Sequence, residues 1–327
     1  MDRKDKMIHS LAITGPTASG KTAISISLAQ TLGAEIICCD SMQIYKEMDI
    51  GTAKATEGER KAVPHHMLDF LSPTESYSAE AYRTAALSVA GDITARGRLP
   101  MFVGGTGLYI DTLMRAPVPH VPESSREYRE KILASVKTEE DIEALWQRLR
   151  DIDPESAEII HKNNIRRVIR AIEIYEQTGK TKSYFDRLSR AESSDIRVGM
   201  ITLDFHNREN LYKRVDLRVE EMLRDGLVAE VKSLYERGLL PKDSTAAQAI
   251  GYKELLAYIE GEATLDEAAE LIKLSTRRYA KRQLTWFRHE ADAYRLYIDN
   301  EDGVMRNKED IISEAKAAAD EFIKEFN

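Results

Sequence analysis

The sequence has little cysteine and no long apolar run, and both shortages narrow the classes of protein to consider. Only Cys38 and Cys39 are present, next to each other. They are too few and too close for a disulfide framework or a four-ligand zinc site, so we expect a reducing compartment. The charged segment Met1 to Ser10 lacks the apolar core of a signal peptide, and no apolar run is long enough to span a bilayer. We therefore expect a cytoplasmic protein without a membrane segment.

A basic excess is also missing. The formal net charge is −8, with 47 Lys and Arg against 55 Asp and Glu. This balance argues weakly against a general nucleic-acid coat protein, so any contact with RNA would depend on local basic patches. Hydrophobic residues make up 43% and charged residues 31% of the 327, as in folded globular proteins. That length predicts two domains, or one core with a large insertion.

The apolar pattern predicts an α/β core. Ile8 to Thr14 has the composition of a short buried strand, and Lys21 to Leu32 is helical after a glycine-rich turn. A strand at Glu35 to Cys39 completes a βαβ unit, which implies a parallel sheet. A helix at Ala79 to Arg96 then precedes a strand at Leu99 to Val103. We predict a P-loop NTPase-like parallel sheet core covered by helices.

The middle of the chain has a different pattern. Linkers containing Pro117, Pro119 and Pro122 lead into amphipathic helices with no convincing strand. A strand returns at Val198 to Phe205, and a last strand is predicted at Tyr294 to Ile298. The predicted parts are residues 1–115 as the first part of the P-loop core, 116–197 as an inserted all-helical subdomain, and 198–327 as the second part with C-terminal helices.

The turn after the first strand carries the strongest single signal. Its residues Gly15, Pro16, Thr17, Ala18, Ser19, Gly20, Lys21 and Thr22 match the P-loop pattern GxxxxGK[ST] between a strand and a helix. The glycines let backbone N–H groups point at phosphate oxygens, and the helix N-terminus adds positive potential. Lys21 supplies a cation and Thr22 an oxygen for magnesium. The pattern predicts binding of two linked phosphates, but it does not separate a nucleotide from another diphosphate.

The P-loop therefore leaves the reaction open. A nucleotide kinase or ATPase pairs this loop with a second carboxylate for magnesium, and Asp40 follows the second strand where such a carboxylate is needed. The next strand breaks at Gly104, Gly105 and Gly107, so its loop reaches the same edge of the sheet. We expect the site at the carboxyl ends of these strands.

Two basic clusters contrast with the acidic balance. One contains Arg277, Arg278, Lys281, Arg282 and Arg288, interleaved with Tyr279, Trp286 and Phe287. The other contains His161, Lys162, Arg166, Arg167 and Arg170. Either cluster alone is more often a solvated helix face. Together, in an acidic protein, they predict a polarised surface that can contact RNA phosphates and stack bases.

Six motifs resemble, in order, those of the tRNA dimethylallyltransferase family, also called tRNA isopentenyltransferases. They are DSMQIYKEMDIGTAK at 40–54, PHHMLD at 64–69, GGTGLY at 104–109, NIRRVIRAIE at 164–173, AIGYKE at 249–254 and RYAKRQLTWFR at 278–288. With the P-loop, the resemblance spans about Ile8 to Arg288. Arg166 stands where some members have glutamine, which leaves one tRNA contact open. The lack of a C-terminal zinc finger of the eukaryotic kind favours a bacterial-type enzyme.

The resemblance implies a reaction and roles for individual residues. The P-loop would hold the pyrophosphate of dimethylallyl diphosphate, with magnesium as cofactor, while the dimethylallyl group moves to the exocyclic amine of an adenine. That adenine lies next to the anticodon of tRNAs reading codons that begin with U. Asp40 is expected to be the base, although spacing alone also allows a carboxylate that contacts magnesium indirectly, through its ligands, or a helix N-cap. Arg214 and Arg218 would reach the phosphates; otherwise they lie on a solvated face and pair with Glu220 or Glu221.

The tRNA contacts follow from the same resemblance. Thr106 would contact both substrates near the reaction centre, and Gln43 could pair with an adenine edge. The expected tRNA-binding residues are Asp40, Ser41, Met42, Gln43, Thr106, Arg166, Arg167, Val168, Ile169, Arg170, Arg278, Lys281 and Arg282. The partner is the anticodon stem-loop, and a monomer is expected. His65 and His66 lack partners at metal-ligand spacing, so a structural role in a loop is expected for them.

Three alternatives stay open at this point. A small-molecule or nucleotide kinase would use the P-loop alone. An adenylate isopentenyltransferase would prenylate free adenine nucleotides, although the basic clusters favour tRNA. A non-catalytic tRNA-binding protein would have little use for a complete P-loop.

Overall fold

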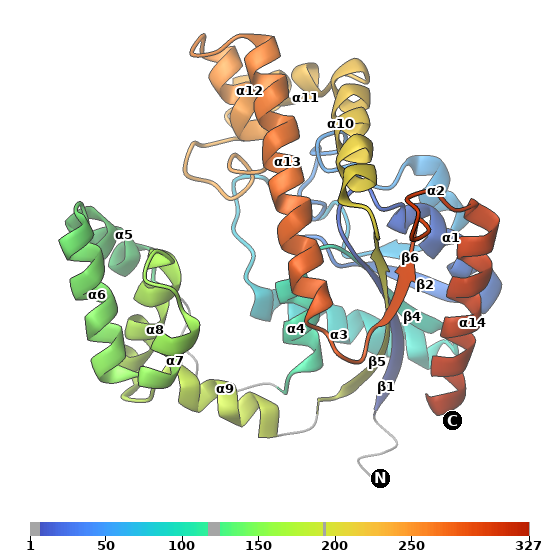
Figure 1. Ribbon diagram of the computed structural model, residues 1–327, viewed down its shortest axis with the longest axis horizontal. Helices are drawn as coiled ribbons and strands as arrows, with labels where there is room; N and C mark the ends of the chain where they lie inside the picture. The colour runs from blue at the N-terminus through green and yellow to red at the C-terminus, as the bar shows by residue number, and fades with distance from the viewer. Residues whose placement is uncertain (1–6, 117–124, 192–193, 327) are drawn as a thin grey trace. The chain divides into compact units, whose positions relative to one another are not determined.

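The computed structural model describes residues 7–116, 125–191 and 194–326, which fall into two compact units (Figure 1). One unit comprises Met1–Met114 and Ile196–Asn327, and the other Arg115–Asp195. The boundaries predicted from the sequence for the inserted subdomain were 116 and 197. The predicted linker with Pro117, Pro119 and Pro122 lies outside the described residues.

The first unit is built on a six-stranded parallel sheet in the order β3-β2-β4-β1-β5-β6. The strands are β1 (Ile8–Thr14), β2 (Ala34–Cys38), β3 (His65–His66), β4 (Leu99–Gly104), β5 (Ile196–Asp204) and β6 (Tyr294–Tyr297). This confirms the predicted α/β fold with a parallel sheet. The prediction of a loop at His65 and His66 is wrong, because both residues pair with β2 at the edge of the sheet. The ring of His66 also hydrogen-bonds the buried carboxylate of Glu35 at 2.7 Å.

The helices of this unit either cover the two faces of the sheet or lie beyond the carboxyl ends of its strands. They are α1 (Lys21–Leu32), α2 (Glu57–Ala62), α3 (Ala79–Ala95), α4 (Gly107–Met114), α10 (Arg208–Arg224), α11 (Leu227–Glu236), α12 (Tyr252–Ile259), α13 (Leu265–Arg288) and α14 (Lys308–Phe326). Leu11 and Ile13 of β1 pack in one cluster with α1 and α14, which lie side by side, whereas Ala12 packs with α3 and α4 (Figure 1). Successive side chains of a strand point to opposite faces, so β1 separates two apolar layers.

A second group of helices lies beyond the carboxyl ends of β5 and β6 (Figure 1). Helices α10, α11, α12 and the first half of α13 enclose an apolar cluster that includes Ile44, Tyr45 and Met48 from the loop after β2. Helix α13 begins with a capping box, in which the side chains of Thr264 and Glu267 bond each other's backbone N–H groups. The loop after β2 is therefore held between the sheet and this helical layer.

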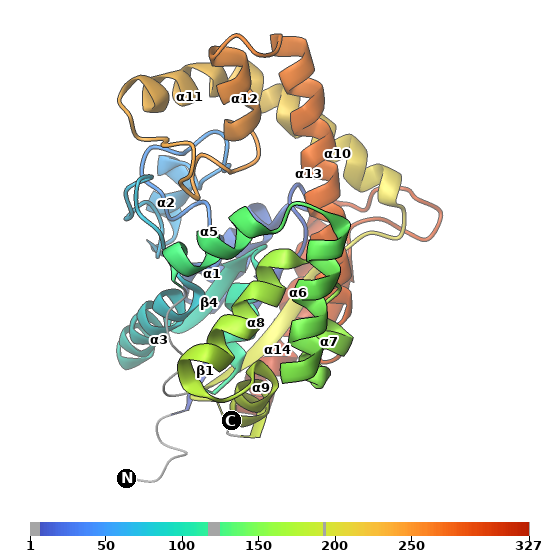
Figure 2. The same ribbon diagram turned by 90° about the vertical axis from the view of Figure 1, so that its left-hand side faces the viewer.

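The second unit is helical in its described residues (Figure 2). Its helices are α5 (Arg126–Ser135), α6 (Glu139–Ile152), α7 (Pro154–Ile159), α8 (Ile165–Thr178) and α9 (Lys182–Ala191). Leu149, Val168, Ile169 and Ile172 are fully buried in its core. Across the described parts of both units, no helix is apolar over the length that a bilayer crossing requires.

Candidate active site

The P-loop joins β1 to α1 and folds tightly on itself. Gly15 has a φ of 134°, and a Cβ there would lie 2.7 Å from the carbonyl oxygen of Leu203 on β5, so only glycine fits. Gly20 has a φ of 94° and turns the chain into α1. The ammonium of Lys21 donates to the carbonyl oxygens of Gly15 at 3.0 Å and Pro16 at 2.7 Å. The loop therefore holds a cation at the first turn of a helix, an arrangement suited to phosphate.

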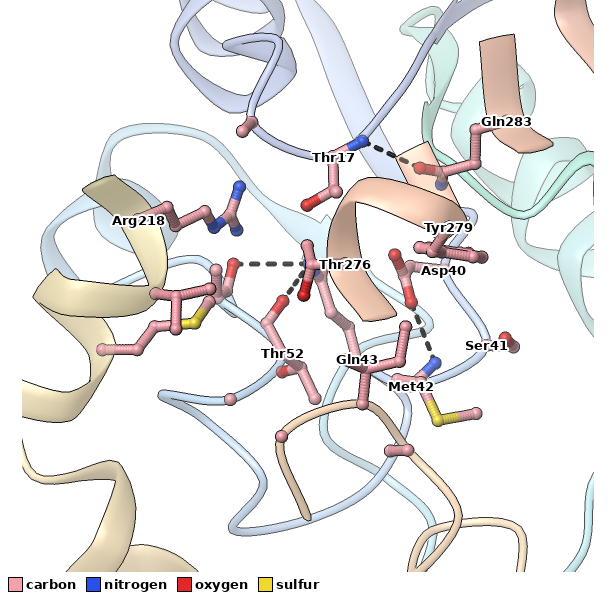
Figure 3. A pocket seen from close by; sticks show the side chains of 18 of the residues that line it. Thr17, Asp40, Ser41, Met42, Gln43, Thr52, Arg218, Thr276, Tyr279 and Gln283 are labelled. Carbon is pink, nitrogen blue, oxygen red and sulfur yellow. Dashed lines mark hydrogen bonds between the residues drawn. The ribbon is translucent and has the colours of Figure 1, made fainter. Parts of the chain in front are cut away.

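A cavity of about 410 Å³ opens beside this loop (Figure 3). The P-loop residues Thr17, Ala18, Gly20, Lys21 and Thr22 line it. The predicted substrate residues Asp40, Ser41, Met42 and Gln43 also line it, as do Arg218 of α10 and Arg282 of α13. The fold thus brings together the P-loop, the loop after β2 and two helices that are distant in the sequence.

Asp40 follows β2 at its carboxyl end and lines the cavity. Its Oδ1 accepts a hydrogen bond from the backbone N–H of Met42 at 2.9 Å (Figure 3). Its Oδ2 has no hydrogen-bond partner among the described residues. No helix begins at Asp40, so the N-cap interpretation is wrong. One oxygen is held in place and the other can accept a proton.

Thr106 connects the loop after β4 with the loop after β2. Its Oγ1 accepts from the backbone N–H of Ser41 at 3.0 Å and donates to the hydroxyl of Ser41 at 3.3 Å. Tyr279 of α13 lines the cavity nearby (Figure 3). Burial, and then the negative charge of Asp40, raise the pKa of Tyr279 above its ordinary value, so the phenol stays protonated as a donor.

The two predicted phosphate arginines differ in position. Arg218 lines the cavity, whereas Arg214 is not part of its lining. The Nε of Arg214 instead donates to the carbonyl oxygen of Ala18 at 2.7 Å, which supports the P-loop from outside. The alternative pairing with Glu220 or Glu221 is not seen among the described residues, and Glu220 instead binds Lys273 at 2.9 Å. The contact of Arg214 with pyrophosphate stays a prediction.

Lys21 is held in an environment that disfavours its charge. Burial and the nearby guanidinium of Arg218 lower its pKa to about 7, against the opposing effect of Asp40. Burial also lowers the pKa of Arg218. The repulsion between Lys21 and Arg218 destabilises the free site, and a bound diphosphate would offset this repulsion.

This pKa predicts that diphosphate binding takes up a proton. A bound anion favours the ammonium, so Lys21 is charged in the complex but partly neutral in the free protein above pH 7. We expect proton uptake near zero at pH 6 and approaching about one proton at pH 8. Calorimetric titration with inorganic pyrophosphate and magnesium, in buffers of different ionisation enthalpy, measures it. The control is Lys21→Arg, in which the side chain stays protonated, so that any proton uptake comes from the ligand alone. Equal proton uptake by the wild type and Lys21→Arg would contradict the assignment of the proton to Lys21.

Gln43 lines the cavity, but its amide is engaged with its own loop. Its Nε2 donates to the carbonyl oxygens of Thr52 at 3.0 Å and Ala53 at 3.3 Å (Figure 3). Pairing with an adenine edge would replace these bonds and stays a prediction.

Glu230, which no sequence pattern predicted as part of the site, anchors this loop. Glu230 of α11 accepts hydrogen bonds from the backbone N–H groups of Asp49, Ile50 and Gly51 at 2.9, 2.7 and 3.1 Å, and from the hydroxyl of Tyr252 at 2.6 Å. A Cβ at Gly51 would meet the Tyr252 ring at 2.5 Å. No local pattern marks Glu230, because its partners are remote in the sequence.

The basic cluster on α13 divides into paired and exposed residues. Arg277 binds Asp216 at 2.7 Å and Arg288 binds the buried Asp204 at 2.7 Å. The prediction that these two arginines belong to an RNA-binding cluster is therefore wrong, because their charges are neutralised within the fold. Arg278, Lys281 and Arg282 are exposed and have no ion-pair partner among the described residues. They remain available for RNA.

The basic cluster of the second unit divides in the same way. Val168 and Ile169 were predicted to bind tRNA, but both are fully buried, so their side chains cannot face RNA. Lys162 binds Glu143 and Arg170 binds Glu173, each at 2.8 Å. Arg166 and Arg167 are exposed at the start of α8, as is His161 just before it. Contact of these exposed residues with tRNA stays a prediction.

Comparison with known proteins agrees with this geometry. A family model described as IPP transferase matches residues 43–290, and one described as isopentenyl transferase matches residues 8–70. The tRNA dimethylallyltransferase of Geobacillus thermodenitrificans is 49% identical over 280 residues, which cover 86% of this chain and 87% of the relative.

Solved structures give the same result. A tRNA isopentenylpyrophosphate transferase from Bacillus halodurans matches with a TM-score of 0.72 and 39% identity, covering 98% of each chain. A eukaryotic dimethylallyltransferase, determined acting on tRNA, matches with a TM-score of 0.78 and 30% identity, covering 97% of this chain and 80% of that one. The chain belongs to the IPP transferase family, the family of the tRNA dimethylallyltransferases.

Proposed function

We propose that the protein transfers the dimethylallyl group of dimethylallyl diphosphate to the exocyclic amine of the adenine adjacent to the anticodon, in tRNAs reading codons that begin with U, and releases pyrophosphate. The observation that carries this proposal is one cavity lined by both the P-loop lysine, Lys21, and the carboxylate of Asp40. An anion-binding loop beside a proton acceptor suits a reaction in which a diphosphate leaves while an amine attacks. The names of the relatives support the choice of substrates.

The leaving group is stabilised by positive charge. As the allylic carbon–oxygen bond breaks, negative charge grows on the pyrophosphate oxygens. Lys21 and Arg218 line the cavity from different helices and carry charges that the free site disfavours. Stabilisation is therefore largest where the departing diphosphate is most negative.

The carboxylate of Asp40 activates the attacking amine. Asp40 accepts a proton from the exocyclic amine as the new nitrogen–carbon bond forms, and the carbon–oxygen bond electrons leave with pyrophosphate. The N–H of Met42 fixes one carboxylate oxygen for this role. Thr106, linked to Ser41, contacts both substrates in this proposal.

The cavity also offers an apolar surface. Val219 and Met222 of α10 and Leu227 of α11 line it. We propose that they receive the five-carbon group, where they shield the allylic carbon from water.

Magnesium fits this site through few protein ligands. In the described residues no group of three or more His, Cys, Asp and Glu could hold a metal. A magnesium ion bound to a diphosphate needs only one or two protein oxygens, and Thr22 and Asp40 both line the cavity. We propose Thr22 as the ligand. When bound, the ion neutralises charge on the pyrophosphate.

The exposed cations are proposed to bind the anticodon stem-loop. An adenine in a loop is turned out of its stack at lower cost than one in a duplex. Arg278, Lys281 and Arg282 on α13, and Arg166 and Arg167 on α8, contact phosphates in this proposal. Arg282 also lines the cavity, which places one of these cations beside the reacting groups.

Salt dependence tests the RNA-binding role of α13. The double variant Arg278→Gln, Lys281→Gln should bind tRNA more weakly, and its plot of log affinity against log salt should flatten by about 0.7 for each lost phosphate contact. Filter binding over a salt series measures both. The control neutralises Lys316 and Lys324 on α14, a helix outside the cavity lining. Equal slopes in wild type and the α13 variant would mean that these residues are a solvated face.

Incorporation of label tests the proposed reaction. Incubation with prenyl-labelled dimethylallyl diphosphate, magnesium and unmodified tRNA should give prenylated adenosine. No incorporation at any salt concentration would contradict the proposal. Labelling of AMP but not tRNA would indicate an adenylate isopentenyltransferase, and transfer of the γ-phosphate of ATP to an acceptor would indicate a kinase.

A further inference from the structure

Gln283 of α13 bridges two loops of the site. Its Oε1 accepts from the backbone N–H of Thr17 at 2.9 Å (Figure 3). Its Nε2 donates to the carbonyl oxygen of Gly105 at 2.8 Å. The residue is 5% exposed. Thr17 belongs to the P-loop and Gly105 precedes Thr106, so one buried amide links the diphosphate loop, the Thr106 loop and the helix.

The bridge needs a side chain with a donor and an acceptor at one end. The amide of glutamine, with its separate acceptor oxygen and donor nitrogen, satisfies both backbone groups without a net charge beside the phosphates. The fit at Gly105 is close, because a Cβ there would lie 2.2 Å from the Nε2 of Gln283. Glycine at position 105 therefore leaves the space that the amide occupies.

The same helix carries the exposed cations. Tyr279 and Gln283, four residues apart and thus on one face of α13, both line the cavity, whereas Arg278 and Lys281 are exposed. Helix α13 therefore has one face toward the diphosphate site and cations available to RNA. A change in its position would reach both loops through Gln283.

We propose that Gln283 is a positioning residue that couples the two substrates. RNA bound to the exposed cations fixes the position of α13. Through its two hydrogen bonds, the amide of Gln283 then fixes the P-loop and the loop of Thr106 relative to that helix. Binding of tRNA then strengthens binding of diphosphate, and the effect is reciprocal by thermodynamic linkage. This inference rests on the proposed function, since it requires RNA to bind α13.

Ligand affinities measured in a cycle test the coupling. The dissociation constant of inorganic pyrophosphate with magnesium is measured with and without an anticodon stem-loop RNA. In the wild type, RNA should tighten pyrophosphate binding on the order of tenfold. In Gln283→Met, which keeps the volume but loses both bonds, the factor should fall to about one. RNA affinity without pyrophosphate should be unchanged.

A second variant removes the same bridge from the other side. Gly105→Ala displaces the amide of Gln283 and should also abolish the coupling, whereas Thr285→Val, which removes a bond within α13 only, should keep it. A merely structural role would lower the fraction of folded protein and leave the ratio of dissociation constants unchanged. Equal ratios in wild type and both bridge variants, or no coupling in the wild type, would overturn the inference. Prenyl transfer by that wild type would still support the proposed function.

Discussion

Asp40→Asn is expected to lower kcat by about 10² to 10⁴-fold while both substrates still bind. Asparagine keeps the oxygen that accepts from the N–H of Met42, so the loop retains its shape, but it cannot take the proton of the adenine amine. Removing a carboxylate from beside Lys21 and Arg218 also removes a charge that repels diphosphate. Pyrophosphate affinity should therefore be unchanged or tighter. Single-turnover kinetics with saturating tRNA measures the chemical step.

The matched control is Asp92→Asn, which neutralises an exposed carboxylate on α3. It should leave kcat and both binding constants unchanged. If Asp40→Asn turns over at a rate close to the wild type, Asp40 is not the base. If it loses tRNA binding together with turnover, its role is in RNA contact.

Lys21→Met is expected to lower kcat/KM for dimethylallyl diphosphate by about 10² to 10³-fold, because a cation aimed at the leaving group is lost. The same substitution should leave the stability of the fold unchanged or raise it. The folded-state pKa of Lys21 is depressed, so the unfolded chain binds this proton more tightly, and the charged lysine opposes folding at every pH below its ordinary pKa. The midpoint of thermal unfolding at pH 7 should therefore be unchanged or higher in the variant.

Lys213→Met provides the control, since Lys213 is exposed on the same helix as Arg218. It should change neither the kinetics nor the unfolding midpoint. Calorimetry and initial-rate kinetics on the same preparations separate the two effects. Loss of activity with a lower unfolding midpoint in Lys21→Met would instead indicate that the lysine mainly holds the P-loop through Gly15 and Pro16.

Local patterns were sufficient for the core of the fold. The βαβ start was predictable because apolar β-branched runs, a glycine turn and a helical segment follow one another without interruption. Edge strand β3 was not, since two residues are too short to show a period. The P-loop and Asp40 could be placed in one site because carboxyl ends of parallel strands share one edge. The cavity lining agrees with that expectation.

Pairing between distant segments explains what the sequence did not reveal. Arg277 and Arg288 look like their exposed neighbours in the sequence, and only the fold brings Asp216 and Asp204 to them. The bridge by Gln283 is similar, since its two partners lie far away in the chain. The available signal was a polar residue, Gln283, on the buried face of an amphipathic helix. This signal indicates a buried hydrogen bond but does not identify the groups that form it.

Isotope labelling tests most directly whether the P-loop holds a leaving group. The substrate is dimethylallyl diphosphate with a heavy oxygen isotope in the atom that joins the allylic carbon to phosphorus. Cleavage between carbon and oxygen sends that atom into pyrophosphate, whereas attack on either phosphorus leaves it bonded to the five-carbon group. We predict that mass spectrometry finds all the heavy oxygen in pyrophosphate, released one-to-one with prenylated adenosine. Heavy oxygen retained on the five-carbon product would contradict the account.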